Sequence, residues 1–368
     1  MSTRIAIVCP IASGGGITEA FFNSLEMLQR QGATPIAIVP EQFSFLERLE
    51  ATGLELHTVA NLERGGTWNF LLQTVRLRQA IRRAKPDILV LNNGRHVAAQ
   101  KRTNPDLPIV AIYHGGKPQR YAKADRVIAV NDALVRELIT LGFPKECIAV
   151  VDNALPVDSL PPFPKRKKNL DFVAGTLCLM EHVKGLDLMI RALAALKSRG
   201  VMVRFLIAGQ GPQEHALKQL AKSCAVEDQL DFVGWVSNTP DFLKKLDLYV
   251  APSRSESWGL GIVEAFAAGL PVISTQTPGP VRVSGNGETA ILVPTEDHHA
   301  LATAIEKVVK DPKLADHLAR AGYERCAERY LLPKVAPLFH SEVMQVLKTD
   351  PNGDTCFPRQ MPTTRPET

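Results

Sequence analysis

Residues 250–273 have the sequence VAPSRSESWGLGIVEAFAAGLPVI. The stretch begins inside an apolar, strand-like run that ends near Ala251, and a loop rich in serine and glycine follows. A helix is predicted from about Gly261 to Gly269, and Pro271 then opens a second apolar run. A strand, a loop, a helix and another strand in this order are typical of one repeat of a parallel α/β sheet.

This stretch also carries two carboxylates, Glu256 and Glu264, with seven residues between them. The helix start between them presents unpaired backbone N–H groups and the positive end of the helix dipole, which together favour an anion such as phosphate. Gly259 and Gly261 let the backbone approach a ligand closely. Carboxylates accept hydrogen bonds from hydroxyl groups. A ligand with hydroxyls on both sides of a diphosphate fits this pattern, and a nucleotide sugar is such a ligand.

The composition is that of a globular protein. The 368 residues are 45% hydrophobic and 22% charged, which excludes a disordered or collagen-like chain and predicts two domains. The net charge of +5 is too small to indicate a nucleic-acid partner. The six cysteines form no C-x-x-C pair and show no zinc spacing, so we expect a reduced, cytoplasmic protein. No stretch approaches the roughly 20 apolar residues that a membrane span needs.

Short apolar runs alternate with helical periodicity along both halves of the chain. In the first half, strands are predicted at 5–9, 35–39, 88–91, 109–112, 127–130 and 148–151, and helices at 18–30, 68–84 and 132–141. In the second half, strands are predicted at 172–174, 203–208, 230–233, 248–251, 271–274 and 291–293, and helices at 185–197, 213–222, 261–268, 299–309 and 313–329. The predicted fold class is α/β, with two tandem Rossmann-like, doubly wound parallel sheets facing an interdomain cleft.

The proline-rich and basic segment at 156–168 interrupts this alternation and predicts a linker. We therefore expect an N-terminal domain at 1–163 and a C-terminal domain at 164–333, to which the family resemblance of the motifs below assigns the acceptor and the nucleotide sugar, respectively. A last helix, at about 334–348, follows Pro333 and is expected to complete the first domain. The tail at 349–368 is poor in hydrophobic residues and is predicted to be disordered.

The stretch from 250 to 273 resembles the E-x(7)-E signature of retaining glycosyltransferases with the two-Rossmann (GT-B) fold, most closely family four. Ser257 and Trp258 stand where Gly-Phe is usual in that family. The resemblance implies that Glu256 contacts the donor hexose as a catalytic residue and that Glu264 contacts the ribose. It also implies donor contacts from the backbone of three consecutive residues, Trp258, Gly259 and Leu260.

Other segments resemble the same family in the same order. Gly14-Gly15-Gly16 after the first strand resembles the glycine-rich loop near the donor phosphates, which assigns Gly15 and Gly16 to the donor site. By the same resemblance, His114 reaches the donor sugar near its anomeric carbon, and Lys184 clamps the diphosphate as a second catalytic group. Four further positions match segments near the nucleotide or its base: Thr176, Gly209, Trp235 and Val236.

The chain departs from the family pattern at the diphosphate clamp. Thr176 occupies the place of an arginine, and a threonine donates only one neutral hydrogen bond. Three other cations are candidates for that role, namely His182, Arg254 and Arg282. Ala154 also replaces a family glycine. The lost arginine and Ala154 keep open the alternative of a catalytically silent partner subunit.

The leading hypothesis is a hexosyltransferase with a nucleotide-sugar donor, and UDP is a guess from the frequency of donors in the family. No D-x-D motif occurs in the sequence, so we expect transfer without a metal ion or other cofactor. The resemblance implies retention of the anomeric configuration and a sugar, lipid-linked or small-molecule acceptor, as in cell-envelope glycan biosynthesis. A nucleotide-sugar epimerase or hydrolase of the same fold remains an alternative.

The predicted helix that starts near Trp68 and extends to Lys85 is basic and amphipathic, with arginines at positions 76, 78, 82 and 83. Such a helix can lie on an anionic membrane, which related enzymes use to reach lipid-linked acceptors. The alternative, which we prefer, is a solvated helix that packs its apolar stripe on the sheet. The expected location is therefore cytoplasmic, with contact at the cytoplasmic membrane face left open.

Overall fold

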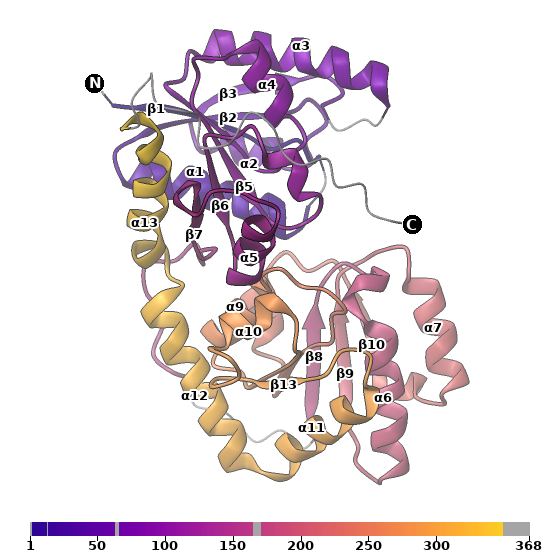
Figure 1. The fold of residues 1–368 in the computed structure, drawn as a ribbon. Helices are drawn as coiled ribbons and strands as arrows, with labels where there is room; N and C mark the ends of the chain where they lie inside the picture. The colour runs from indigo at the N-terminus through magenta and orange to yellow at the C-terminus, as the bar shows by residue number, and fades with distance from the viewer. Residues whose placement is uncertain (1, 13, 63–65, 165–170, 349–368) are drawn as a thin grey trace. The chain divides into compact units, whose positions relative to one another are not determined.

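The computed structural model describes residues 2–12, 14–62, 66–164 and 171–348 (Figure 1). The chain divides into two compact units. One contains residues 1–156 and 332–368, and the other contains residues 157–331. The boundaries expected from the sequence, at 163 and 333, lie a few residues away from these. The basic run at 165–168 and the tail at 349–368 lie outside the described residues.

The first unit has a seven-stranded parallel sheet in the order β3-β2-β1-β4-β5-β6-β7. Its strands are β1 (Arg4–Val8), β2 (Thr34–Pro40), β3 (Glu55–Val59), β4 (Ile88–Leu91), β5 (Ile109–Tyr113), β6 (Arg126–Ala129) and β7 (Ile148–Val150). Its helices are α1 (Gly16–Arg30), α2 (Leu46–Glu50), α3 (Thr67–Ala84), α4 (Val97–Thr103), α5 (Asp132–Thr140) and α13 (Leu332–Met344). The five strands between the edge strands β3 and β7 are nearly continuous runs of buried, mostly aliphatic residues, as expected for a sheet that helices cover on both faces.

The last helix, α13, returns to this first unit and packs along α1 (Figure 1). Arg126 at the start of β6 forms an ion pair with Glu342 of α13, and both side chains are largely buried. The helix begins before Pro333, which occupies its first turn, and it contains Pro337. The helix therefore starts two residues before the predicted range of about 334–348, since a proline in the first turn loses no intrahelical hydrogen bond. At its other end it continues as the 3-10 turn Gln345–Leu347.

The second unit has a six-stranded parallel sheet in the order β10-β9-β8-β11-β12-β13. Its strands are β8 (Val173–Leu177), β9 (Arg204–Ala208), β10 (Leu230–Gly234), β11 (Leu248–Ala251), β12 (Val272–Thr275) and β13 (Ile291–Val293). Its helices are α6 (Leu186–Ser198), α7 (Glu214–Ser223), α8 (Thr239–Leu243), α9 (Leu260–Ala267), α10 (Pro278–Val283), α11 (His298–Lys310) and α12 (Pro312–Arg329). This confirms the predicted fold class of two doubly wound parallel sheets.

Several elements were not predicted, and each lacks a long apolar pattern. Strand β3 lies at the edge of its sheet, and only its last residue, Val59, is fully buried. The helices α2, α8 and α10 have five or six residues, and α8 and α10 contain proline in their first turns. Such short elements depend on the tertiary structure rather than on their own helical propensity.

Candidate functional site

In each unit the strand order reverses between two neighbouring strands, and ligands of open parallel sheets bind beyond the carboxyl ends of such strands. In the second unit this point lies between β8 and β11. Lys184 belongs to the 3-10 turn His182–Lys184 that follows β8, and Glu256 lies in the loop that follows β11. The Nζ of Lys184 lies 2.6 Å from Oε2 of Glu256. The two predicted catalytic residues of this unit are therefore brought together.

The Lys184–Glu256 ion pair keeps some access to solvent, since the side chains are 25% and 20% exposed. Burial alone would lower the pKa of Lys184, but the attraction and hydrogen bond of Glu256 outweigh it and raise the pKa above its ordinary value. Lys184 therefore carries its positive charge at neutral pH.

Gly185 explains how Lys184 reaches the loop after β11. Its φ of +65° is left-handed, and a Cβ at this position would lie 2.0 Å from the carbonyl oxygen of Pro252. The Lys-Gly pair thus lets the end of the turn press against the backbone of the β11 loop. Any larger residue would push Lys184 away from Glu256.

The start of α9 has the geometry expected for an anion site. Gly259 is the N-cap in a left-handed conformation, and Leu260 is the first helical residue. The backbone N–H of Trp258 points to Oε1 of Glu256 at 3.5 Å, while the indole ring is buried edge-on against Tyr330. The indole ring of Trp258 is therefore buried away from solvent, and its predicted backbone contact with the donor stays a prediction. Glu264 is the fifth residue of α9, about one turn into the helix.

Arg254, a candidate for the missing phosphate clamp, is already paired with two carboxylates. Its guanidinium binds Asp187 with two hydrogen bonds of 2.7 and 2.8 Å, and its Nε binds Glu296 at 2.6 Å. It also donates to the carbonyl oxygen of His182 at 2.8 Å, and its backbone N–H donates to Val183. The hydrogen bond to Asp187 raises the pKa of Arg254 above its ordinary value. Arg254 therefore holds the turn that carries Lys184.

Beneath this site lies a buried hydroxyl that the sequence did not single out. Tyr249 of β11 is 3% exposed, and its Oη accepts from the backbone N–H of Leu177 at 3.5 Å and donates to the Leu177 carbonyl at 3.3 Å. A Cβ on Gly261 would lie 2.2 Å from this Oη. Thr176 is buried and hydrogen-bonds to Tyr249. These contacts hold the end of β8 against the first turn of α9.

The remaining predicted donor contacts of this unit lie at the same edge of the sheet. Gly209, just after β9, donates its N–H to the carbonyl oxygen of Gly234 at 2.7 Å, and a Cβ there would lie 1.9 Å from the carbonyl oxygen of Cys178. Trp235 follows β10 and is 55% exposed, and Val236 beside it is partly buried. The loops after β8, β9 and β10 therefore lie next to one another at this edge of the sheet.

His114 lies in the first unit, directly after β5 (Ile109–Tyr113). Its Nε2 lies 3.1 Å from Oδ1 of Asn92, a residue that follows β4 and that the sequence analysis did not identify. Burial lowers the pKa of His114 to about 4, so its imidazole is neutral at pH 7. Gly15 is the N-cap of α1, and Gly16 is its first residue. Both glycines therefore lie at a helix start after β1, beside the point where this sheet reverses.

The outer face of α3 exposes apolar side chains. Trp68 is 83% exposed, and Leu71, Leu72 and Val75 are each 54–55% exposed. A different face, which includes Leu77 and other buried residues, packs on the sheet. The helix thus packs an apolar stripe on the sheet, as in the preferred interpretation, but Trp68, Leu71 and Leu72 are not part of that stripe.

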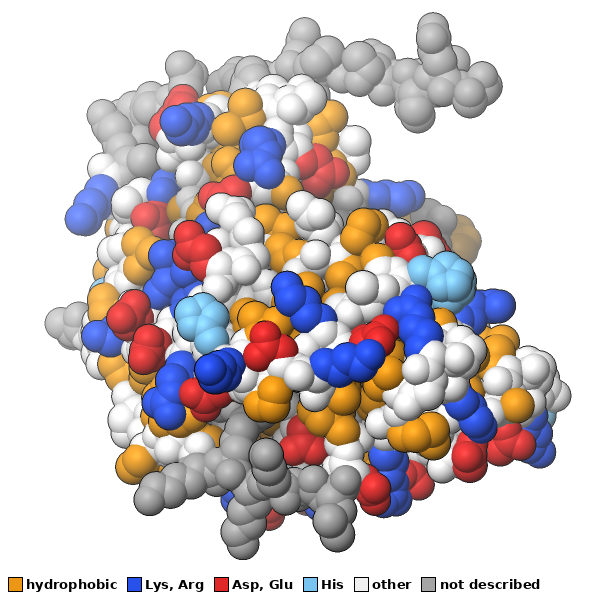
Figure 2. Space-filling model, turned by 90° about the horizontal axis from the view of Figure 1, so that it is seen from below, with side chains coloured by type: hydrophobic (Ala, Val, Ile, Leu, Met, Phe, Trp, Pro, Cys, Tyr) orange, Lys and Arg blue, Asp and Glu red, His pale blue; other side chains and the backbone are white. Residues whose placement is uncertain are grey.

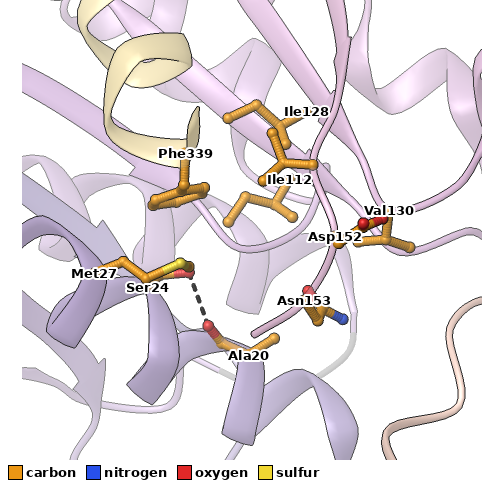
Figure 3. Close-up of a pocket in the computed structure, with 10 residues that line it drawn as sticks. Ala20, Ser24, Met27, Ile112, Ile128, Val130, Asp152, Asn153 and Phe339 are labelled. Carbon is orange, nitrogen blue, oxygen red and sulfur yellow. Dashed lines mark hydrogen bonds between the residues drawn. The ribbon is translucent and has the colours of Figure 1, made fainter. Parts of the chain in front are cut away.

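A small pocket in the first unit lies between α1, the sheet and α13, and Met27, Ile112 and Phe339 line it with seven other residues (Figure 3). None of the predicted site residues lines this pocket.

On the face shown in Figure 2, basic and acidic side chains are interspersed, with no large area of one sign. In the described part of the chain, no helix is long and apolar enough to span a membrane.

The two doubly wound units, with an acidic and glycine-rich helix start at the switch point of the second, define the GT-B class of glycosyltransferases. The family profile "Glycosyl transferases group 1" matches residues 163–325, and "Glycosyltransferase Family 4" matches residues 14–159. The chain therefore belongs to the family-four type of glycosyltransferases, and it is an enzyme of that class.

Curated relatives and solved structures agree with this assignment. The chain is 26% identical over 317 residues to the lipopolysaccharide core biosynthesis glycosyltransferase LpsE of Rhizobium meliloti, which covers 84% of this chain and 90% of the relative. A glycosyltransferase from Rickettsia africae has the same fold, with a TM-score of 0.80, 18% identity and coverage of 95% of this chain and 100% of the other. Anabaena Alr3699/HepE in complex with UDP-glucose has a TM-score of 0.78, 18% identity and coverage of 94% and 99%.

Proposed function

We propose that the protein transfers a hexose from a nucleotide sugar, with UDP as the preferred nucleotide, to a sugar, lipid-linked or small-molecule acceptor. The observation that carries this proposal is the Lys184–Glu256 ion pair at the start of α9. A cation, a carboxylate and a helix N-terminus meet there, and these groups match a diphosphate that is joined to a polyhydroxylated sugar.

Donor binding would rearrange the existing Lys184–Glu256 ion pair. A diphosphate near α9 offers Lys184 an anionic partner, and Glu256 then becomes available to accept hydrogen bonds from hexose hydroxyls. The charge of Lys184 stabilises the negative charge that grows on the leaving diphosphate as the glycosidic bond breaks. In this proposal Glu264 binds the ribose.

We propose further that the transfer retains the anomeric configuration and needs no metal ion. Lys184 and the N-terminus of α9 supply the positive potential that a divalent cation supplies in other nucleotide-sugar enzymes. The expected result is activity that persists in excess EDTA and a kcat/KM that falls by roughly 10²–10³ in the Lys184→Ala variant. Activity that depends on added Mg²⁺ or Mn²⁺ would contradict it.

The nucleotide and the reaction are tested together on the purified full chain. A thermal-shift screen of UDP-, GDP- and ADP-sugars is expected to show stabilisation by one nucleotide series, since ligand binding raises apparent stability. Product analysis follows with the donor alone and with candidate acceptors. Rapid hydrolysis or epimerisation of the donor without an acceptor would favour the alternative enzyme classes. No binding of any nucleotide sugar would favour a silent subunit.

We also propose that α3 brings the enzyme to an anionic membrane surface. Its exposed residues Trp68, Leu71, Leu72 and Val75 lie at the helical spacing i, i+3, i+4 and i+7 and so form one face, and Arg82, Arg83 and Lys85 are exposed further along. Apolar residues combined with nearby basic ones are the pattern of a helix that lies at a lipid interface. Lipid-linked acceptors would be reached there.

Co-sedimentation with vesicles of anionic and of neutral lipid tests this contact. We expect binding to anionic vesicles that falls with salt and weakens in the Leu71→Ser/Leu72→Ser double variant. Met202→Ser is the matched control, because Met202 is 58% exposed in the other unit. Equal binding of all three proteins would contradict a role for α3.

A further inference from the structure

Asn92 lies at the switch point of the first sheet, where a ligand-facing residue is expected. It directly follows β4, and its backbone N–H donates to the carbonyl oxygen of Val8 in β1 at 3.0 Å. Its side chain is fully buried. The strand order reverses between β1 and β4, and this side chain lies between the first turn of α1 and His114, which follows β5.

The contacts of Asn92 fix which way its amide points. Nδ2 donates to the carbonyl oxygen of Ile17 at 2.9 Å, and the amide also hydrogen-bonds to the thiol of Cys9. The reversed amide would place an oxygen against the carbonyl oxygen of Ile17, where two acceptors repel each other. Oδ1 is therefore the atom that faces Nε2 of His114 at 3.1 Å.

An amide oxygen only accepts hydrogen bonds, so Nε2 of His114 carries the proton. The low pKa of His114, about 4, leaves a single proton on the ring at neutral pH. Nδ1 is then unprotonated, and it makes no hydrogen bond to any of the described residues. The ring nitrogen that remains for a ligand is thus an acceptor.

We propose that Asn92 is a positioning residue, which holds His114 in the Nε2–H tautomer so that Nδ1 accepts a hydrogen bond from a sugar hydroxyl. Only the catalytic consequence rests on the proposed function, because the tautomer itself follows from the contacts of the first unit. A neutral amide also suits this role better than a carboxylate, which would stabilise the charged, donor-only imidazolium.

The tautomer is measured directly on the full-length wild-type protein labelled with ¹⁵N-histidine. Long-range ¹H–¹⁵N correlation at pH 7 distinguishes the protonated from the unprotonated ring nitrogen, and the spectrum of His114→Gln assigns the signals. We expect a protonated Nε2 and an unprotonated Nδ1. A proton on Nδ1, or on both nitrogens, overturns the inference without any variant of Asn92.

Three variants separate positioning from simple structural support. Asn92→Ala is expected to give a mixture of tautomers, and Asn92→Asp to keep Nε2–H while raising the pKa of His114. Asn23→Ala is the matched control, because Asn23 is also a buried asparagine whose amide donates to a backbone carbonyl, that of Ala154, in the same unit. If Asn92→Ala leaves a pure Nε2–H tautomer, Asn92 does not set it.

Kinetics complete the test once a donor is known. Asn92→Ala is expected to lower kcat by roughly tenfold, about what one lost hydrogen bond costs, with a smaller change in the KM for the donor. Unchanged kcat in a variant with mixed tautomers overturns the catalytic part. If no nucleotide sugar binds the wild-type protein, the proposed function fails while the measured tautomer still decides the role of Asn92.

Discussion

The ammonium group of Lys184 and the carboxylate of Glu256 lie 2.6 Å apart, although 72 residues separate them in the chain. One follows β8 and the other follows β11, the two central strands between which the order of the second sheet reverses. Further hydrogen bonds fix the backbone at both residues. Arg254 binds the carbonyl oxygen of His182 in the turn that carries Lys184, and the N–H of Gly279 donates to the carbonyl oxygen of Glu256 at 2.9 Å. The pair is therefore a built feature of the loops rather than a chance surface contact.

Replacing Lys184 by alanine is expected to lower kcat/KM by roughly 10²–10³, since a positioned group that stabilises transition-state charge is worth about that much. Steady-state kinetics with the donor identified in the screen measures the effect. Lys197→Ala is the control, because Lys197 also pairs with an acid of the same unit, Asp228, on the exposed surface. Full activity of Lys184→Ala would refute its assigned role.

Replacing Glu264 by alanine is expected to weaken nucleotide binding by about tenfold or more, because hydrogen bonds to a charged group contribute roughly 1.5–3 kcal/mol. Isothermal titration calorimetry with the free nucleoside diphosphate measures this without turnover. Glu214→Ala, a change to a partly exposed acid on α7 that pairs with Lys218, is expected to bind as the wild type does. Equal affinity of the two variants would remove Glu264 from the ribose contact.

Replacing Arg254 by alanine is expected to destabilise the second unit by about 1–3 kcal/mol. The change removes the ion pair of Asp187 and the hydrogen bond to the His182 carbonyl oxygen in the turn that carries Lys184. Urea unfolding gives the free energy. Glu296→Ala removes the other partner, whose side chain is 58% exposed, and is expected to cost less than about 1 kcal/mol. A larger loss in Glu296→Ala than in Arg254→Ala would show that the network is anchored elsewhere.

Gly261 and Tyr249 are expected to be energetically coupled. Gly261→Ala forces a methyl group against the Tyr249 hydroxyl and is expected to cost about 1–3 kcal/mol. Tyr249→Phe removes that oxygen together with its hydrogen bonds to Leu177, so the double variant is expected to lose less than the sum of the two single losses. A double-mutant cycle from denaturant unfolding measures the coupling. Simple additivity would mean that α9 shifts to accommodate the alanine.

The first unit is expected to lose stability as the pH falls from about 6.5 to 4. His96 is buried and stacks on Phe70 at 5.3 Å, and burial lowers its pKa to about 4. Between that value and the ordinary value of about 6.5, the unfolded chain binds more protons than the folded one, so His96 alone makes stability rise with pH by up to about 1.4 kcal/mol per unit. His114, whose pKa is also about 4, adds to this slope. Urea unfolding at pH 7, 6 and 5 measures the slope.

His96→Phe keeps the stacking on Phe70 and removes the titrating group, so its stability is expected to depend less on pH. His215→Gln, a change to an exposed histidine on α7, is expected to keep the slope of the wild type. The pH dependence is not due to His96 if His96→Phe keeps that slope as well.

The sequence by itself determined the fold class and most strands, because a strand buried in a parallel sheet must be a short, nearly continuous apolar run. Three ranges, those of β4, β11 and β13, were predicted to the residue. The helix start between Glu256 and Glu264 could also be predicted, since glycines, carboxylates and a following strand are local signals. The local pattern did not reveal β3, because an edge strand needs no apolar alternation on both faces.

Only the tertiary structure decided which groups work together. Asn92 and Tyr249 carry no motif, and their importance comes from what the sheet places beside them, namely the His114 ring and the first turn of α9. The engagement of Arg254 with Asp187 and Glu296, in place of a phosphate, likewise depends on side chains that are distant in the chain. Hydrophobic periodicity specifies the local element, whereas hydrogen bonds and ion pairs between loops depend on distances that exist only after the sheet has formed.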